Sequence, residues 1–239
     1  MGMPVSIEVL DAIPPAALAD AFAWLRRVDA LFSTYRADSE ISRLDRGSLP
    51  LRHAHPDVRS VLERCEELRL ETGGFFDVRA AGSLDPSGFV KGWAVERAAT
   101  ILERAGARCF WVNAGGDVLV RGGNPWRVGI QHPRLRDRLA GVVVLSDGAV
   151  ATSGGYERGP HVVNPHSGRP ANDALSVTVI GPELGAADAF ATAALAMGTG
   201  GPAWTASLSG FEAMTITGDE RVLTTPGFLS YCPGGSVAA

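Results

Sequence analysis

The chain of 239 residues has little of what marks several common classes of protein. Its 3 cysteines, Cys65, Cys109 and Cys232, are widely spaced and indicate neither a disulfide framework nor a zinc cluster. The formal net charge of -4 gives no electrostatic reason to expect nucleic acid or a membrane surface as a partner. No apolar run approaches the roughly 20 residues of a membrane span. We therefore expect a protein with no nucleic-acid partner and no membrane span.

The first residues carry no visible targeting signal. Residues 1–7 pass directly into strand-like sequence, without the basic segment and apolar run of a signal peptide, so the expected location is the cytoplasm. Hydrophobic residues make up 46% of the chain, which is enough for a sizeable core. The length suits one domain, which we expect to span residues 1–239 with a frayed tail from residue 234.

Lysine is almost absent, because among 22 basic residues Lys91 is the one lysine. It follows residues 85–88, a run of turn-forming residues, and precedes apolar residues at helical spacing that Gly106 ends. This pattern predicts a loop that leads into a helix, with Lys91 near the helix start. Backbone N–H groups at a helix N-terminus together with one cation suit a phosphate. The alternative is an ordinary glycine loop with a surface lysine.

Periodicity along the chain predicts the α+β class. Helices are expected to follow Pro15 and Pro56, the latter ending at 73–74, and a helix of small residues is expected over 186–197. The segment 31–44 has the composition of turns. Because helices dominate the first half and mostly antiparallel strands the second, the fold class is α+β. Strands are expected near 5–10, 75–78, 109–112, 118–120, 126–130, 142–145, 175–180, 211–217 and 221–224.

Seven short segments stand in a characteristic order and spacing, namely 33–35 with 38–40, 74–78, 85–92, 113–117, 151–154, 161–165 with 168–170, and 187–193. Together they resemble the ApbE family of FAD:protein FMN transferases. The resemblance runs from residue 1 to about residue 198. It implies a single T-fold-like α+β domain that binds FAD, requires magnesium, transfers FMN to a threonine or serine hydroxyl of an acceptor protein, and releases AMP.

The resemblance also implies roles for individual residues. The position of His161 resembles that of the family's candidate base, and the metal position maps onto Asp188, Thr192 and the main-chain carbonyl near Gly88. The residues expected to contact or support the bound FAD are Met1, Ser33, Thr34, Tyr35, Asp85, Lys91, Asn113, Gly115, Gly116, Asp117 and Val163.

The residue chemistry is consistent with these roles but leaves alternatives open. Asp188 and Thr192 are four residues apart in a predicted helix and project from one face, where their oxygens suit magnesium. They could instead be a helix-start carboxylate and a packed threonine. Asp117 could bind a ribose hydroxyl or cap the turn at 115–116. His161 could take a proton from an acceptor hydroxyl or bond locally at a strand edge.

Three departures from the family pattern bear on function. The segment 78–84 is very short, Ala191 stands where some members carry a second acid, and Asn164 replaces the usual aspartate before Pro165. An FAD pyrophosphatase that uses water as acceptor is therefore an alternative at the same site. A non-catalytic FAD-binding protein is a third possibility, suggested by the shortened segment.

Overall fold

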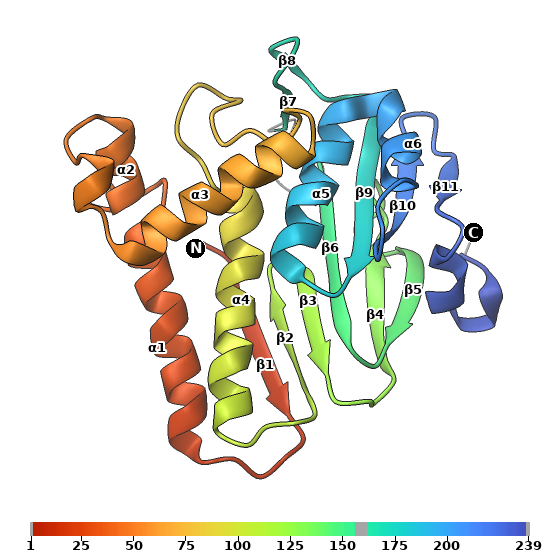
Figure 1. Ribbon diagram of the computed structural model, residues 1–239. Helices are drawn as coiled ribbons and strands as arrows, with labels where there is room; N and C mark the ends of the chain where they lie inside the picture. The colour runs from red at the N-terminus through yellow and green to blue at the C-terminus, as the bar shows by residue number, and fades with distance from the viewer. Residues whose placement is uncertain (1, 156–161, 238–239) are drawn as a thin grey trace.

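A seven-stranded antiparallel sheet forms the centre of the computed structural model, which describes residues 2–155 and 162–237 (Figure 1). The strand order is β1-β2-β3-β6-β9-β10-β11, and each of the pairings between neighbours is antiparallel. The expected α+β class is confirmed. The strands are β1 (Val5–Val9), β2 (Phe110–Ala114), β3 (Asp117–Arg121), β6 (Gly148–Gly154), β9 (Ala174–Gly181), β10 (Glu212–Thr217) and β11 (Val222–Thr224).

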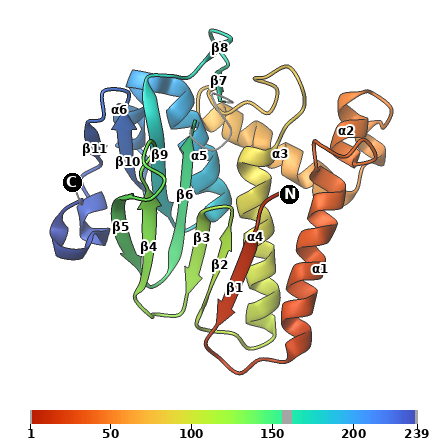
Figure 2. The same ribbon diagram turned by 180° about the vertical axis from the view of Figure 1, so that it is seen from behind.

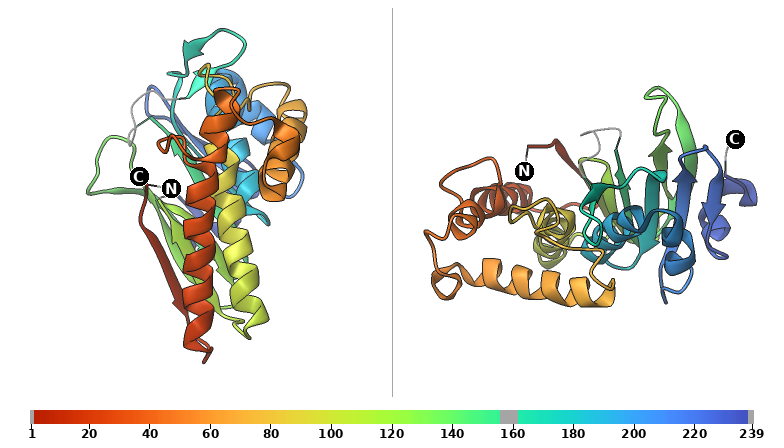
Figure 3. Two further views of the ribbon diagram at one scale, coloured as in Figure 1. Left: turned by 90° about the vertical axis from the view of Figure 1, so that its left-hand side faces the viewer. Right: turned by 90° about the horizontal axis from the view of Figure 1, so that it is seen from above.

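Helices cover one face of the sheet in two tiers. Seen from above in Figure 3, α1, α4 and α5 lie against the sheet, and α3 crosses outside them as the outermost layer. The helices are α1 (Pro15–Phe32), α2 (Glu40–Asp45), α3 (Pro56–Glu71), α4 (Ser87–Arg104), α5 (Leu184–Met197) and α6 (Gly201–Thr205), and the short turn η1 (Leu51–His53) precedes α3. In the described residues, no helix is long and apolar enough to cross a membrane.

A two-stranded ribbon of β4 (Trp126–Gln131) and β5 (Leu139–Leu145) covers part of the opposite face (Figure 2). It belongs to a second hydrophobic cluster with β10 and the turn η3 (Phe228–Tyr231), separate from the main core under the helices. A smaller hairpin of β7 (Val163–Asn164) and β8 (Arg169–Pro170) lies above the end of α5 in the view of Figure 1.

The central helix α5 shows how sequence sets packing here. Of its 14 residues, 12 are buried, because small side chains allow neighbours to approach on every side. Gly198, with φ of 61°, ends the helix at the position that the sequence predicts, because glycine adopts a positive φ readily. By contrast, α1 buries a single stripe at helical spacing, formed by Ala17, Ala21, Leu25, Val28 and Phe32.

Two local predictions were wrong. Residues 75–78 form no strand, because the two preceding glycines turn the chain and the Phe76 amide donates to Thr72 Oγ1 at 3.0 Å. An apolar run signals burial, and here the burial is in a loop. The segment 31–44 is more helical than its composition indicates, since α1 continues to Phe32 and α2 begins after Ser39. The Ser39 hydroxyl oxygen accepts from the Ser42 amide at 3.1 Å and so caps α2.

Candidate functional site

A cavity of about 770 Å³ opens between the start of α4, the middle of α5, the ribbon-side face of the sheet, and β4. Its volume lies within the roughly 300–1,000 Å³ of small-molecule sites. Met1 and His161 lie outside the described residues. Every other expected site residue lines this cavity, namely Ser33, Thr34, Tyr35, Asp85, Gly88, Lys91, Asn113, Gly115, Gly116, Asp117, Val163, Asp188 and Thr192.

The crossing of α4 and α5 sets the position of the polar end of the cavity. A Cβ on Gly92 would lie 2.4 Å from the Gly185 nitrogen, so the two backbones touch with no room for a side chain. Glu96 Oε1 accepts a hydrogen bond from the Gly185 amide at 3.0 Å. Burial raises the pKa of the Glu96 carboxyl above its usual range, although amide donors from Gly185 and Leu184 oppose the shift. The hydrogen bond between Glu96 and Gly185 holds α4 against α5 and so fixes the positions of the residues next to the crossing.

Those residues include Lys91 and Asp188, which meet beside Asp117 at the start of β3. Lys91 Nζ lies 2.5 Å from Asp117 Oδ2 and 3.6 Å from Asp188 Oδ2. The Asp117 and Asp188 side chains are 2% and 3% exposed, whereas Lys91 is 19% exposed. Asp117 Oδ1 also accepts the Thr152 amide of β6 at 3.1 Å. One ammonium thus pairs with two buried carboxylates and still reaches the cavity.

Hard oxygen donors gather next to this cluster. Thr192 Oγ1 lies 3.0 Å from Ser153 Oγ, and a Cβ on Gly88 would lie 3.3 Å from Thr192 Oγ1, which places the start of α4 against Thr192. Over the described ranges, no group of three His, Cys, Asp or Glu side chains could hold a metal ion. A site of one carboxylate, one hydroxyl and one carbonyl fits magnesium, which retains waters and accepts phosphate oxygens. The residues present therefore fit the ion that the family resemblance implies.

The turn between β2 and β3 is capped by Asn113 and not by Asp117. Asn113 Oδ1 accepts the Gly116 amide at 2.9 Å, so Asn113 caps the turn. Asp117 faces Lys91 instead. A Cβ on Gly115, where φ is 60°, would lie 2.7 Å from Met3 Sδ, and Met3 lines the cavity. The N-terminal segment therefore packs over this turn and completes the wall.

The wall formed by residues 33–35 is held by the segment that follows it. The Ser39 hydroxyl donates to the Ser33 carbonyl at 2.7 Å while it caps α2, and Ser33 Oγ accepts the Tyr35 amide at 3.3 Å. Tyr35 itself is 83% exposed at the rim. The clustering of residues 33–35 with 38–40 in the sequence thus has a structural cause, because the second group positions the first.

The remaining expected residues lie where loops reach the cavity. Asp85 Oδ1 accepts the Ser87 amide at 3.0 Å and so stabilises the first turn of α4. Val163 lies at the start of the β7–β8 hairpin, which contacts the opposite loop through His166, whose Nε2 lies 3.0 Å from the Gly73 carbonyl oxygen. The His166 ring also meets Phe75 edge to face, with centroids 4.5 Å apart. Two loops far apart in sequence therefore form one wall.

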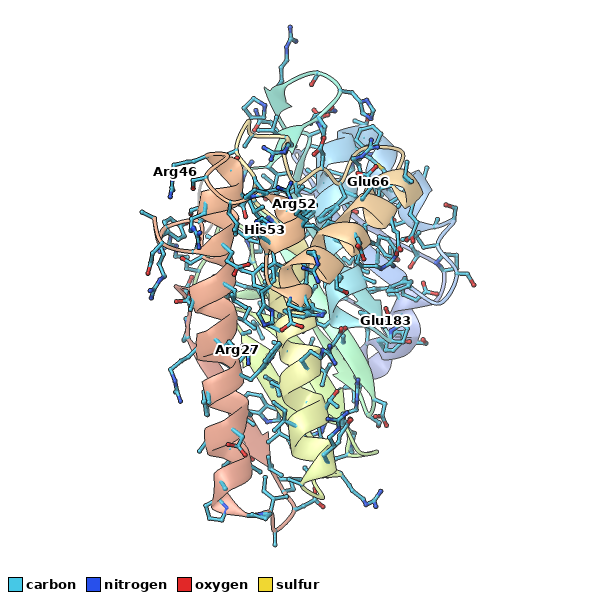
Figure 4. The ribbon with its side chains drawn as sticks, turned by 60° about the vertical axis from the view of Figure 1, so that its left-hand side comes forward. Arg27, Arg46, Arg52, His53, Glu66 and Glu183 are labelled. Carbon is cyan, nitrogen blue, oxygen red and sulfur yellow. The ribbon has the colours of Figure 1, made fainter. Side chains whose placement is uncertain are left out.

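The ribbon side of the cavity went unpredicted. Its lining includes Trp111 of β2 and a row along β4, comprising Trp126, Arg127, Val128, Gly129, Ile130 and Gln131. Alternation did indicate the strand at 126–130, but alternation cannot tell which surface a strand covers. On the helical side, Figure 4 shows Arg27 on α1, His53 in η1 and Glu66 on α3, and these three residues do not line the cavity.

The sequence matches the ApbE family over residues 1–82 and 78–215. The chain belongs to the ApbE family. A Vibrio cholerae protein named FAD:protein FMN transferase is 34% identical over 129 residues, which is 48% of this chain and 39% of that protein. A Rhodobacter capsulatus protein of the same name is 35% identical over 159 residues, which is 61% of this chain and 30% of its own length. The matched segments therefore span well under half of either relative.

Similarity of fold extends over nearly the whole ApbE chain. The structure described as flavin transferase ApbE from Vibrio cholerae superimposes with a TM-score of 0.84 over 97% of this chain and 96% of its own. Its sequence identity is 24%, so this likeness establishes the fold.

Proposed function

We propose that this protein transfers FMN from FAD, with magnesium, to a threonine or serine hydroxyl of an acceptor protein and releases AMP. The observation that carries the proposal is the cluster of Lys91, Asp117 and Asp188 in the wall of the cavity, beside the oxygen donor of Thr192. Family membership and the names of the relatives support the same reaction.

The residues of the chain would act mainly by binding and orienting the pyrophosphate. Lys91 presents a cation at the second turn of α4, and the buried carboxylate of Asp117 limits where that cation can lie. Asp188, Thr192 and the carbonyl near Gly88 would hold the magnesium ion. When bound there, magnesium would supply positive charge that offsets the negative charge of the phosphates.

The reaction itself exchanges one phosphorus–oxygen bond for another. The acceptor hydroxyl oxygen forms a bond to the phosphorus of the FMN half of FAD, while the bond from that phosphorus to the bridging oxygen breaks and AMP leaves. The proton of the hydroxyl must pass to a base, and the family resemblance assigns this role to His161. A neutral imidazole in this role is worth roughly 10²–10⁴-fold in rate.

An incubation with FAD and magnesium tests the proposal. With an acceptor flavoprotein present, we expect a covalently bound, fluorescent FMN on the acceptor and an equal amount of AMP. FMN and AMP released equally well without acceptor would identify a pyrophosphatase. FAD that binds but stays intact in both incubations would identify a non-catalytic FAD-binding protein and would contradict the proposal.

The enzyme itself is a control acceptor. Thr152 lies within β6, paired on one side with Thr178 of β9, and its hydroxyl lies 2.9 Å from Thr178 Oγ1. A threonine fixed in this way cannot approach a bound phosphate in line as a nucleophile. The intact mass of the protein after incubation with FAD and magnesium should therefore stay unchanged, and a gain of one FMN at Thr152 would show that it modifies itself.

A further inference from the structure

The one lysine of the chain lies where a cation bound at Asp188 would compete with it. Lys91 Nζ is 3.6 Å from Asp188 Oδ2, the carboxylate that would bind the magnesium ion, and 2.5 Å from Asp117 Oδ2. Both carboxylates are almost completely buried, so water screens their charges poorly. Any charge added at Asp188 must therefore act strongly on the Lys91 ammonium.

The net charge of the site that these three side chains form changes sign as each ligand binds. Lys91, Asp117 and Asp188 together carry one net negative charge. A divalent cation alone would turn this into one net positive charge, with two cations repelling each other in a buried site. The pyrophosphate of FAD brings two negative charges and restores the original balance. Each ligand therefore favours the other through the ammonium of Lys91, in addition to any direct contact between them.

The structure also gives Lys91 a way to respond. Asp117 is held in place by the Thr152 amide and by the start of β3, and Asp188 lies in the tightly packed α5. Lys91 has a flexible four-carbon stem and is the most exposed of the three side chains. The carboxylates are fixed, and the ammonium is the group that can move toward the cavity.

We propose that Lys91 is a tethered counter-ion of the metal position at Asp188, which weakens cation binding until the FAD pyrophosphate draws the ammonium away. This inference rests on the proposed function, because it takes Asp188 as the metal ligand. It makes the binding of FAD and of the divalent cation mutually dependent, and by thermodynamic linkage each must strengthen the other by the same factor. A factor of roughly ten is typical of such couplings.

Manganese, followed by the electron paramagnetic resonance of the free ion, measures the coupling directly. In the wild-type protein at pH 8, saturating FAD should lower the manganese Kd roughly tenfold. Riboflavin, which lacks phosphate, should leave the Kd unchanged. An equal effect of riboflavin and FAD would contradict the role given to the pyrophosphate.

The decisive variant is Lys91→Met, which keeps the stem and removes the charge. Without FAD, manganese should bind this variant several-fold more tightly than wild type, because the competing cation is gone, while FAD alone should bind more weakly. Arg127→Met is the matched control, since it removes a cation from the ribbon wall of the same cavity and should leave the manganese Kd unchanged. Unchanged or weaker manganese binding in Lys91→Met would overturn the inference.

A second measurement needs no variant. Because Lys91 is the one lysine, labelling lysine with ¹⁵N gives a single side-chain ammonium signal. Magnesium added to the protein without FAD should shift that signal, and a signal that magnesium leaves in place would overturn the inference. Failure of the inference is distinguishable from failure of the metal site. Manganese binding that Asp188→Asn abolishes but Lys91→Met leaves unchanged contradicts the coupling alone, whereas binding unaffected by Asp188→Asn contradicts the proposed metal site.

Discussion

The two sides of the cavity are built in different ways. On the helical side, Lys91, Asp117 and Asp188 are set by backbone contact at the Gly92–Gly185 crossing and by buried polar contacts. On the ribbon side, β4 lines the cavity from outside the main sheet and packs in the second hydrophobic cluster through apolar side chains. Backbone contact and buried charge tolerate little change, whereas apolar packing tolerates substitutions of similar shape.

Under the proposed function, we expect the helical side to bind the reacting phosphate and the ribbon side to shape the site. A reacting phosphate needs charges placed within a fraction of an ångström, which the crossing of two packed helices supplies. A planar ligand ring needs only an apolar surface of about the right size. We therefore expect substitutions on the helical side to lower activity and stability more than substitutions on the ribbon side.

The largest effect is expected from Asp188→Asn. The amide keeps the shape of the side chain but removes the negative charge on which cation binding depends, so magnesium-dependent transfer should fall by at least about 100-fold in kcat/KM. The thermal transition should change little, because the variant leaves Lys91 paired with Asp117 and leaves the cluster without a net charge. Steady-state kinetics at several magnesium concentrations measure this, and wild-type activity at low magnesium would contradict it.

Gly92→Ala should break the geometry of the helical side through its backbone. The new Cβ would lie 2.4 Å from the Gly185 nitrogen and 2.5 Å from the Leu184 carbonyl carbon, so α4 and α5 must separate. We expect a loss of at least about 2 kcal/mol in the free energy of unfolding by urea denaturation. The matched control is Gly200→Ala, because φ is -79° there and the nearest atom to the new Cβ is 4.0 Å away. Equal stability of the two variants would contradict the role of the crossing.

Glu96→Gln tests the contact that fixes the crossing through its pH dependence. Burial raises the pKa of the Glu96 carboxyl in the folded protein above its ordinary value of 4.5. Between the ordinary pKa and the raised folded-state pKa, the folded state therefore binds more protons than the unfolded state. The stability that this residue contributes is present at low pH and declines as the pH rises through the folded-state pKa. The variant should therefore gain stability relative to wild type between pH 4.5 and pH 8. A constant difference across that range would show that burial does not shift this pKa.

The smallest effect is expected on the ribbon, from Trp126→Phe. Trp126 Nε1 is buried and has no hydrogen-bond partner in the part of the chain that the structure describes, so the variant removes little but volume. Stability should stay within about 1 kcal/mol of wild type, and the FAD Kd within roughly threefold. Trp111→Phe, which removes the bond from Trp111 Nε1 to Glu8 Oε2 at 2.9 Å, should cost more stability. A large loss of FAD affinity in Trp126→Phe would show that the ribbon binds the ligand by a specific hydrogen bond.

The sequence predicted the helices of the helical side, because the spacing of nearby residues carries the information about a helix and its faces. Asp188 and Thr192 share a helix face by spacing alone, and the turn residues before α4 predict its start. The pairing of Lys91 with Asp117 was not predicted, because it joins α4 to β3, and the rest of α4 and all of β2 lie between the two residues in the chain. The position of β4 over the sheet was not predicted for the same reason, since long-range packing leaves no periodic pattern in the sequence.

Under the proposed function, the cluster at the α4–α5 crossing binds both the cation and the FAD pyrophosphate. A crystal of the protein grown with FAD and manganese, with data collected at the manganese absorption edge, tests it most directly. We expect an anomalous peak for a manganese ion coordinated by the Asp188 carboxylate and the Thr192 hydroxyl, with a phosphate oxygen in contact with Lys91. A manganese peak away from Asp188, or a pyrophosphate bound along β4 out of reach of Lys91, would contradict it.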